Sequence, residues 1–302
     1  MPAFHHNWGR LRARHAAFSS NLEIRTARIR QAMTMDQPQY SIVIPAFNEQ
    51  ARIGATLERV MECIRVRAWT AEVLVVNDGS RDRTAAIVSA AALKHPNLRL
   101  IENPGNRGKG YSVRNGMLQA RGAIVMFTDA DLSAPIEEAE LLFAAIANGA
   151  DVAIGSRWLD RSRQTLRQPI YRRFFGRCFN WLTRLVMNLP LADTQCGFKA
   201  FRREAAQTIF IRQRIERWGF DPEILYIALR LGMRIDEVPV TWGHDERSRI
   251  SYLKDGLKMM EDLLRVRFYS LAGCYRGDPC QDGGLGGCGD CRKTKAAPVA
   301  KT

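Results

Sequence analysis

The chain has 302 residues (34.2 kDa), enough for one α/β domain with extensions, and its 46% hydrophobic and 25% charged residues are typical of a globular protein. It contains no apolar run of about 18 residues, and residues 1–20 lack the apolar core of a secretory signal, so we expect a cytoplasmic protein without a membrane-spanning helix. The net charge of +14 indicates an anionic partner.

The positive charge is local. Residues 1–35 carry six arginines against one glutamate, and residues 157–190 carry eight arginines against one aspartate. The rest of the chain is nearly neutral. Charge alone leaves nucleic acid, an anionic membrane surface and a phosphorylated substrate open as partners.

Apolar, β-branched runs alternate with helical patterns through the first half of the chain. Strands are predicted at residues 40–47, 72–76, 98–102, 123–127 and 150–157, and helices at 49–66, 85–95, 111–122 and 135–149. This alternation predicts an α/β fold with a mostly parallel central sheet flanked by helices on both faces.

The second half is less regular. Residues 168–190 read as a helix with a broad apolar face and arginines between the apolar positions, and residues 193–204 read as a turn-like glycine segment. A helix over 217–233, a strand running into a basic loop over 234–253 and a helix over 255–271 are predicted next.

Polar or charged residues follow each of the first five predicted strands. In open α/β sheets ligands bind beyond the carboxyl ends of the strands, so these groups are expected to form one site. They are Asn48-Glu49, Asn77 to Ser80, Asn106 to Gly110, Asp129 to Asp131, and Gly155 to Arg157.

The pair Asp129 and Asp131 is the strongest single signal. Two carboxylates one residue apart repel each other unless a cation lies between them. Mg²⁺ or Mn²⁺ prefers such oxygen ligands and completes its shell with water and substrate phosphate. The alternative is that Asp131 or Ser133 caps the helix that follows Pro135.

Two further groups have a binding and a purely structural interpretation. Asp78 is a candidate acceptor for hydrogen bonds from a base or ribose, with Gly79 permitting a close turn, but the same residues are common in β-turns. In the glycine-rich loop, Arg107 and Lys109 suit phosphate binding or a solvated loop.

Taken together, these motifs resemble a known family. PAFNE, VVNDGSRDRT, NRGKGYSVRNG, TDADLSAP and GSR, in this order, are similar to the family 2 glycosyltransferases with a GT-A fold. DTQCGFKAF, RWGFDPEIL and ERSRISYL resemble the branch that makes polyprenyl-phosphate sugars, including the dolichyl-phosphate beta-glucosyltransferases and the dolichol-phosphate mannose synthases. The resemblance covers about residues 40–265.

The resemblance implies inverting transfer of a sugar from a nucleotide donor to a polyprenyl monophosphate at a membrane surface. The expected nucleotide-sugar contacts are Pro45, Ala46, Asn48, Glu49, Asp78, Gly79, Lys109, Asp129 and Ala130. Asp129 and Asp131 are expected to bind the metal. The expected contacts of the acceptor phosphate are Arg157, Arg172, Arg173, Ser248 and Arg249.

Asp221 is a further candidate catalytic acid, to contact the sugar or act as a base, unless it caps the helix at Pro222. Mannose synthases often have glutamine two residues after the second aspartate, where this chain has Ser133. The resemblance therefore favours UDP-glucose over GDP-mannose as donor.

The predicted organisation is a basic arm (1–38), a glycosyltransferase domain (39–270) with an interfacial amphipathic region (165–190), and a glycine- and cysteine-rich tail (271–302). Arginines mixed with aromatic residues in that region suit a peripheral position on the membrane. Cys63, Cys178 and Cys196 are predicted to be reduced core thiols. Cys274, Cys280, Cys288 and Cys291 fit a zinc site, redox chemistry or a disordered tail.

Other functions remain open at this stage. A soluble or protein acceptor would keep the fold and the donor site. A nucleotidyltransferase on a similar sheet would release pyrophosphate instead of a nucleoside phosphate. A basic nucleic-acid-binding module without catalysis would explain the charge but not the paired aspartates, and we do not expect nucleic acid as a partner.

Overall fold

The computed structural model describes residues 37–160, 181–243 and 252–275. Its contacts divide the chain into Met1–Pro38 and Gln39–Thr302. The first unit lies almost wholly outside the described residues. The second unit contains every helix and strand given below.

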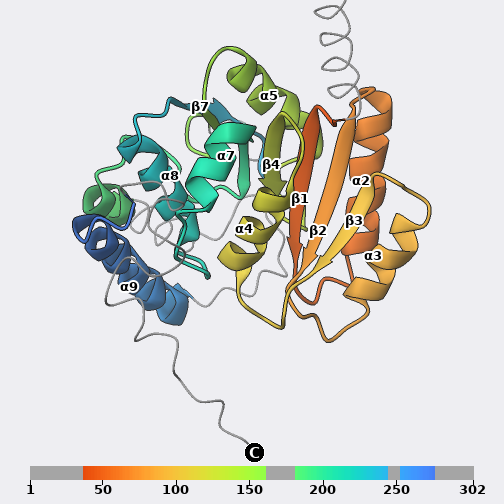
Figure 1. The fold of residues 1–302 in the computed structure, drawn as a ribbon, viewed down its shortest axis with the longest axis horizontal. Coiled ribbons are helices and arrows are strands. Elements are labelled where there is room, and N and C mark those ends of the chain that lie inside the picture. Colours follow the sequence, from red (N-terminus) through yellow and green to blue (C-terminus); the bar gives the residue numbers. More distant parts are fainter. Residues whose placement is uncertain (1–36, 161–180, 244–251, 276–302) are drawn as a thin grey trace, which may run out of the picture. The chain divides into compact units, whose positions relative to one another are not determined.

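A seven-stranded sheet forms the centre of the second unit, in the order β3-β2-β1-β4-β6-β5-β7 (Figure 1). The strands are β1 (Tyr40–Ala46), β2 (Ala71–Asn77), β3 (Leu98–Glu102), β4 (Ile124–Thr128), β5 (Val152–Ser156), β6 (Phe198–Arg202) and β7 (Ile235–Pro239). All neighbours are parallel except β6, which runs antiparallel to both β4 and β5. The predicted α/β fold with a mostly parallel sheet is confirmed.

Helices cover both faces of this sheet, as Figure 1 shows. The helices α2 (Ile53–Val66), α3 (Thr84–Ala92) and α5 (Ala139–Ala147), with the 3-10 turn η1 (Ile136–Glu138), pack on one face. The helices α4 (Lys109–Gln119), α7 (Arg203–Phe210), α8 (Phe220–Arg230) and α9 (Tyr252–Leu271) belong to the other side.

Strand residues alternate between the two cores. Ile42 and Ile44 of β1 face the first core, whereas Val43 faces the second, and all three are fully buried. A strand buried on both faces needs apolar residues at every position, which explains the continuous apolar runs of the sequence.

The predicted turn-like segment 193–204 is partly wrong, because Phe198–Arg202 form β6 and Arg203 begins α7. The sequence interrupts this strand with Lys199, whose side chain is nevertheless fully buried. The antiparallel strand β6 joins the β1–β4 half of the sheet to β5 and β7, and so brings residues 193–199 to the end of β4.

Candidate active site

A cavity of about 440 Å³ opens at the carboxyl ends of β1, β2 and β4, beside the first turn of α4. Its walls come from five separate segments of the chain. They are Pro45, Ala46, Phe47, Glu49, Arg52, Asp78, Asn106, Gly108, Lys109, Ser112, Asp129, Ala130, Asp131, Arg217 and Trp218. The cavity lies at the edge of the sheet where ligands bind in open α/β folds.

The two aspartates that follow β4 both line this cavity. A carboxylate oxygen of Asp131 accepts the backbone N–H of Ser133 at 2.9 Å, and the helical turn η1 has no side-chain cap. Neither Asp131 nor Ser133 therefore acts as the helix cap. Burial, followed by repulsion from Asp129, raises the pKa of Asp131, so this pair of carboxylates is electrostatically suited to a cation.

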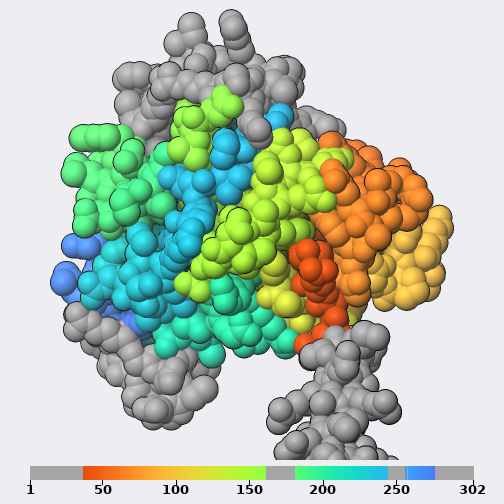
Figure 2. All heavy atoms as spheres, turned by 90° about the horizontal axis from the view of Figure 1, so that it is seen from above, coloured from red at the N-terminus to blue at the C-terminus, as the bar shows by residue number. Residues whose placement is uncertain are grey.

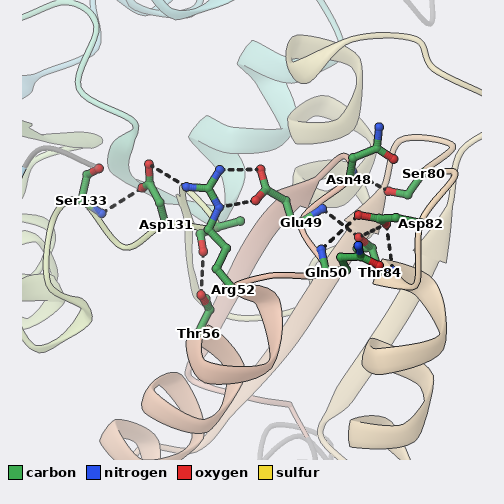
Figure 3. A network of polar contacts seen from close by, with 11 residues as sticks. Asn48, Glu49, Gln50, Arg52, Thr56, Ser80, Asp82, Thr84, Asp131 and Ser133 are labelled. Carbon is green, nitrogen blue, oxygen red and sulfur yellow. Dashed lines mark hydrogen bonds and ion pairs between the residues drawn. The ribbon is translucent and has the colours of Figure 1, made fainter. Parts of the chain in front are cut away.

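Arg52, at the start of α2, connects Asp131 to the loop after β1 (Figure 3). Its guanidinium pairs with Glu49 and lies 3.9 Å from Asp131. In the same figure Asn48, whose N–H donates to Ser80, ties the loop after β1 to the loop after β2. Because Glu49, Arg52 and Asp131 line the cavity, this network of polar contacts holds one of its walls in place.

Lys109 pairs with the other aspartate. Its ammonium contacts Asp129 and lies 5.6 Å from the ring centre of Trp218 and 6.0 Å from that of Phe220. Burial alone would lower the pKa of Lys109, but the carboxylates of Asp129 and Asp221 outweigh burial and raise it. The ammonium therefore stays charged and balances the negative charge of the Asp129 carboxylate.

Asp78 lines the cavity while it holds the glycine-rich loop. Its carboxylate accepts the N–H groups of Arg107 (2.9 Å) and Gly108 (2.8 Å) and the amide of Asn103 (2.9 Å). Gly79 does not line the cavity. With φ of +68°, it passes so close to Gly105 that an added Cβ would lie 2.7 Å from the Gly105 carbonyl carbon.

The start of the segment 192–199 is held in place by hydrogen bonds to β7 and to Arg157. Glu237 of β7 accepts the N–H groups of Ala192 (2.7 Å) and Asp193 (2.9 Å). Asp193, fully buried, accepts the Nε and Nη2 of Arg157 at 2.6 and 2.8 Å. Arg157, although burial opposes it, holds the pKa of Asp193 below its usual range.

Asp221 lies in the first turn of α8 and does not act as the helix cap, a position held by Gly219. The buried ammonium of Lys199 donates to the Asp221 carboxylate at 2.5 Å and to the Cys196 carbonyl oxygen at 2.6 Å. Asp221 is 5% exposed, and its charge acts on Lys109. It therefore lies behind the cavity wall, between two lysines.

Most residues predicted to bind the nucleotide sugar or the metal line one cavity, and the others do not line it. The cavity is lined by Pro45, Ala46, Glu49, Asp78, Lys109, Asp129, Ala130 and Asp131. Asn48, Gly79, Arg157 and Asp221 are not among its lining residues. Arg172, Arg173, Ser248 and Arg249 lie outside the described residues.

Sequence reasoning missed Phe47, Arg52, Ser112, Arg217 and Trp218 as lining residues. Two of them had a usable signal, since Phe47 lies between Ala46 and Asn48, and Trp218 belongs to the RWGFDPEIL motif. Arg52 had none, because its contact with Asp131 crosses from α2 to the end of β4.

The predicted core thiols Cys63 and Cys196 are buried, and burial raises the pKa of Cys196 to about 12. Cys274 is half-buried near the end of α9. Cys178, Cys280, Cys288 and Cys291 lie outside the part of the chain that the structure describes. Within that part, no helix is long and apolar enough to cross a membrane.

Comparison with known proteins identifies the family. Residues 41–210 match the glycosyl transferase family 2. The chain belongs to this family. It is 40% identical to a dolichyl-phosphate beta-glucosyltransferase of Trichomonas vaginalis over 78% of this chain and 72% of the relative. It is 33% identical to the human dolichyl-phosphate beta-glucosyltransferase over 79% of this chain and 78% of the relative.

A solved structure confirms the GT-A fold of this glycosyltransferase. Glucosyl-3-phosphoglycerate synthase from Mycobacterium tuberculosis, crystallised with Mn²⁺, UDP-glucose and glycerol 3-phosphate, superimposes with a TM-score of 0.55 at 21% identity. The match covers 78% of this chain and 80% of that one. Family membership makes the chain a glycosyltransferase and not a noncatalytic binding module.

Proposed function

We propose that this glycosyltransferase transfers glucose from UDP-glucose to a polyprenyl monophosphate of the dolichyl phosphate type, with Mg²⁺ or Mn²⁺ and with inversion at the anomeric carbon. The observation that carries the proposal is the convergence of Asp129 and Asp131 on a cavity at the carboxyl ends of the strands. The names of the relatives support the sugar and the acceptor, and the solved structure supports the donor and the metal.

The residues present fit such a metal. Two carboxylates line a cavity with room for a diphosphate, and the described residues contain no cluster of three or more His, Cys, Asp or Glu that would enclose an ion completely. A cation held by few protein ligands keeps positions for phosphate oxygens and water, as Mg²⁺ does. When bound, it would neutralise the charge that develops on the leaving diphosphate.

The acceptor chemistry needs positioning more than proton removal. A phosphate monoester has a second pKa near 6, so it is largely a dianion at neutral pH. An acceptor oxygen forms the new bond to the anomeric carbon from the face opposite the leaving group. The bond from that carbon to the UDP oxygen breaks, and UDP leaves with the electron pair.

We assign the acceptor phosphate to Arg157, with Arg172, Arg173, Ser248 and Arg249 as further contacts. Arginine binds phosphate through a planar fork of donors. The pair with Asp193 fixes the plane of the Arg157 guanidinium, which supports a positioning role for this arginine. Asp221 lies behind the cavity wall and is held by Lys199, so we assign it neither to the sugar hydroxyls nor to acceptor deprotonation.

We assign the enzyme to the membrane surface as a peripheral protein. The described part of the predicted interfacial region is residues 181–190, of which 181–187 are helical. Trp181 and Leu185 of this helical segment are each 63% exposed and lie one turn apart. In Figures 1 and 2 this green segment lies beside the C-terminal part of α9, in blue. There Leu264, Phe268 and Leu271 are also exposed.

The test measures transfer of labelled sugar into an organic-extractable product, with polyprenyl phosphate and Mg²⁺ present. UDP-glucose and GDP-mannose are compared, each with a chelator control. Label from UDP-glucose that the chelator abolishes is the expected result.

The other outcomes separate the alternatives. Label from GDP-mannose alone would contradict the sugar and the base. Release of nucleoside diphosphate without labelled lipid would contradict the acceptor. Full transfer in the presence of the chelator would contradict the metal.

A further inference from the structure

The ammonium of Lys109 forms an ion pair with Asp129, one of the two carboxylates that the proposed function assigns to the metal. It is surrounded by the negative charges of Asp129, Asp221 and Asp131. The side chain is largely buried against the rings of Trp218 and Phe220. In this state the lysine supplies the positive charge that the carboxylates require.

A divalent cation and this ammonium compete for the same carboxylate. Both need the negative charge of Asp129, and two cations at hydrogen-bonding distance of one carboxylate repel each other strongly in a partly buried site. A lysine has a flexible stem and three rotatable donors, so it can change partner without movement of the backbone.

A second acid whose charge acts on Lys109 is already engaged. Asp221 holds the ammonium of Lys199 at 2.5 Å, so a second lysine gains little there. Two other acids of the cavity are also engaged, since Glu49 pairs with Arg52 and Asp78 accepts three N–H groups. The donor diphosphate, which enters with the metal, is therefore the partner that Lys109 gains in the loaded cavity.

We propose that Lys109 exchanges partners during donor binding: it neutralises Asp129 in the free enzyme and transfers to the nucleotide diphosphate when the metal takes Asp129. This inference rests on the proposed function, because it requires a metal at Asp129 and Asp131. It gives Lys109 a role in the order of events, since the empty site discriminates against the metal without its nucleotide.

Arg52 does not take part in this exchange. Its guanidinium is 3.9 Å from Asp131 and pairs with Glu49, so its charge is held by a partner outside the metal site. The two cations next to the carboxylates therefore have different functions: Arg52 is fixed and Lys109 is displaced.

The experiment compares the wild type with Lys109→Met in two titrations. Binding of Mn²⁺ without nucleotide is followed by electron paramagnetic resonance of the free ion, and binding of UDP at saturating Mn²⁺ is followed by calorimetry. Lys94→Met, which removes an exposed lysine beyond α3, is the matched control.

Exchange predicts effects of opposite sign. Lys109→Met should bind Mn²⁺ alone about tenfold more tightly, because a competing charge is gone, and should bind UDP about tenfold more weakly, because a diphosphate contact is lost. Lys94→Met should match the wild type in both. If Lys109→Met does not fold, Lys109→Gln replaces it in both titrations.

Other patterns overturn the inference. Tighter Mn²⁺ binding with unchanged or tighter UDP binding would mean that the lysine stays on Asp129. Unchanged or weaker Mn²⁺ binding would mean that it does not compete. Asp131→Asn, titrated with Mn²⁺ in the presence of UDP, separates the two proposals: if this variant then binds Mn²⁺ like the wild type, or the wild type binds none even with UDP, the metal site itself fails together with the exchange.

Discussion

At the scale of single residues, Gly197 determines where the first aspartate of the pair can lie. A Cβ added at this position would be 2.1 Å from one carboxylate oxygen of Asp129 and 2.7 Å from its carboxyl carbon. The three nearest atoms all belong to the Asp129 side chain. A side chain at position 197 therefore displaces the carboxylate and leaves the surrounding core in place.

Gly197→Ala is accordingly expected to lower turnover about 100-fold, since a displacement of about 1 Å at a reacting centre has an effect of that size. The free energy of unfolding should change by less than about 1 kcal/mol, as for most substitutions outside the core. Steady-state kinetics and urea unfolding measure the two quantities. Gly256→Ala in α9, where an added Cβ meets no atom within 4 Å, is the control and should retain wild-type turnover. Equal turnover of both variants would contradict the positioning role.

The buried ion pair of Lys199 and Asp221 contributes to stability through two single residues. Lys199 is fully buried and Asp221 nearly so, and a buried charge that loses its partner is strongly destabilising. Lys199→Met should lower the free energy of unfolding by about 3–5 kcal/mol. In urea unfolding, the double variant Lys199→Met/Asp221→Asn should recover much of this loss. Additive losses would show that the two residues are not coupled.

At the scale of elements, Glu223 of α8 joins three segments around the cavity. It is fully buried and accepts the N–H groups of Arg214 and Ile215, both at 2.9 Å. Its third donor is the hydroxyl of Tyr275, after α9, at 2.7 Å. The segment after Ile215 leads directly to Arg217 and Trp218 in the cavity wall. Glu223 therefore fixes the position of that wall.

Burial raises the pKa of Glu223 to about 7 in the folded protein, against 4.5 for an exposed glutamate. The folded state therefore binds more protons than the unfolded state between these values, and stability falls as the pH rises from 4.5 to 7. The contribution is at most about 3 kcal/mol, at about 1.4 kcal/mol per pKa unit. Glu223→Gln should remove this component, so its unfolding free energy should depend less on pH than that of the wild type. Parallel pH profiles would contradict the assignment.

At the scale of the whole molecule, the fold could be predicted wherever a strand is buried on both faces. Most of β1, β2, β4 and β5 lies in apolar runs, at residues 42–47, 73–76, 124–127 and 152–155, and polar residues follow each run. Both the strands and their binding edge are therefore visible in the sequence. The strand β6 was missed because Lys199 interrupts it, and only the partner Asp221, 22 residues later, makes that lysine tolerable inside the sheet.

In the candidate site, too, residues that are local in sequence could be predicted and contacts between distant segments could not. The aspartates after β4 and the loop after β1 were predicted because they are local in sequence. Arg52, the bracing of Asp193 by Arg157 and the close approach of Gly197 to Asp129 depend on contacts between distant segments, which no local pattern encodes.

The charge of the whole molecule leads to the last prediction, which concerns membrane binding. A net charge of +14 favours anionic vesicles over neutral ones, and raising the salt from about 0.1 to 1 M should weaken binding, because the screening length falls from about 10 to 3 Å. The exposed Trp181 and Leu185 should add a contribution that salt does not remove. Trp181→Ser/Leu185→Ser is therefore expected to lower the partition coefficient about tenfold or more at high salt, since burial of one large apolar side chain contributes about 1.5–3 kcal/mol.

Vesicle co-sedimentation at both salt concentrations measures these effects, with Leu93→Ser as the control. Leu93, next to α3, is 89% exposed and lies far in sequence from the basic region. Its replacement therefore tests whether any exposed leucine contributes equally to vesicle binding. A double variant that binds like Leu93→Ser at high salt would show that the helical segment 181–187 does not enter the bilayer. Binding that disappears entirely at high salt for the wild type would assign the attraction to charge alone. Retention of wild-type binding after Leu93→Ser, together with loss after the double replacement, would place the lipid-facing surface on the side of the molecule where residues 181–187 lie beside α9.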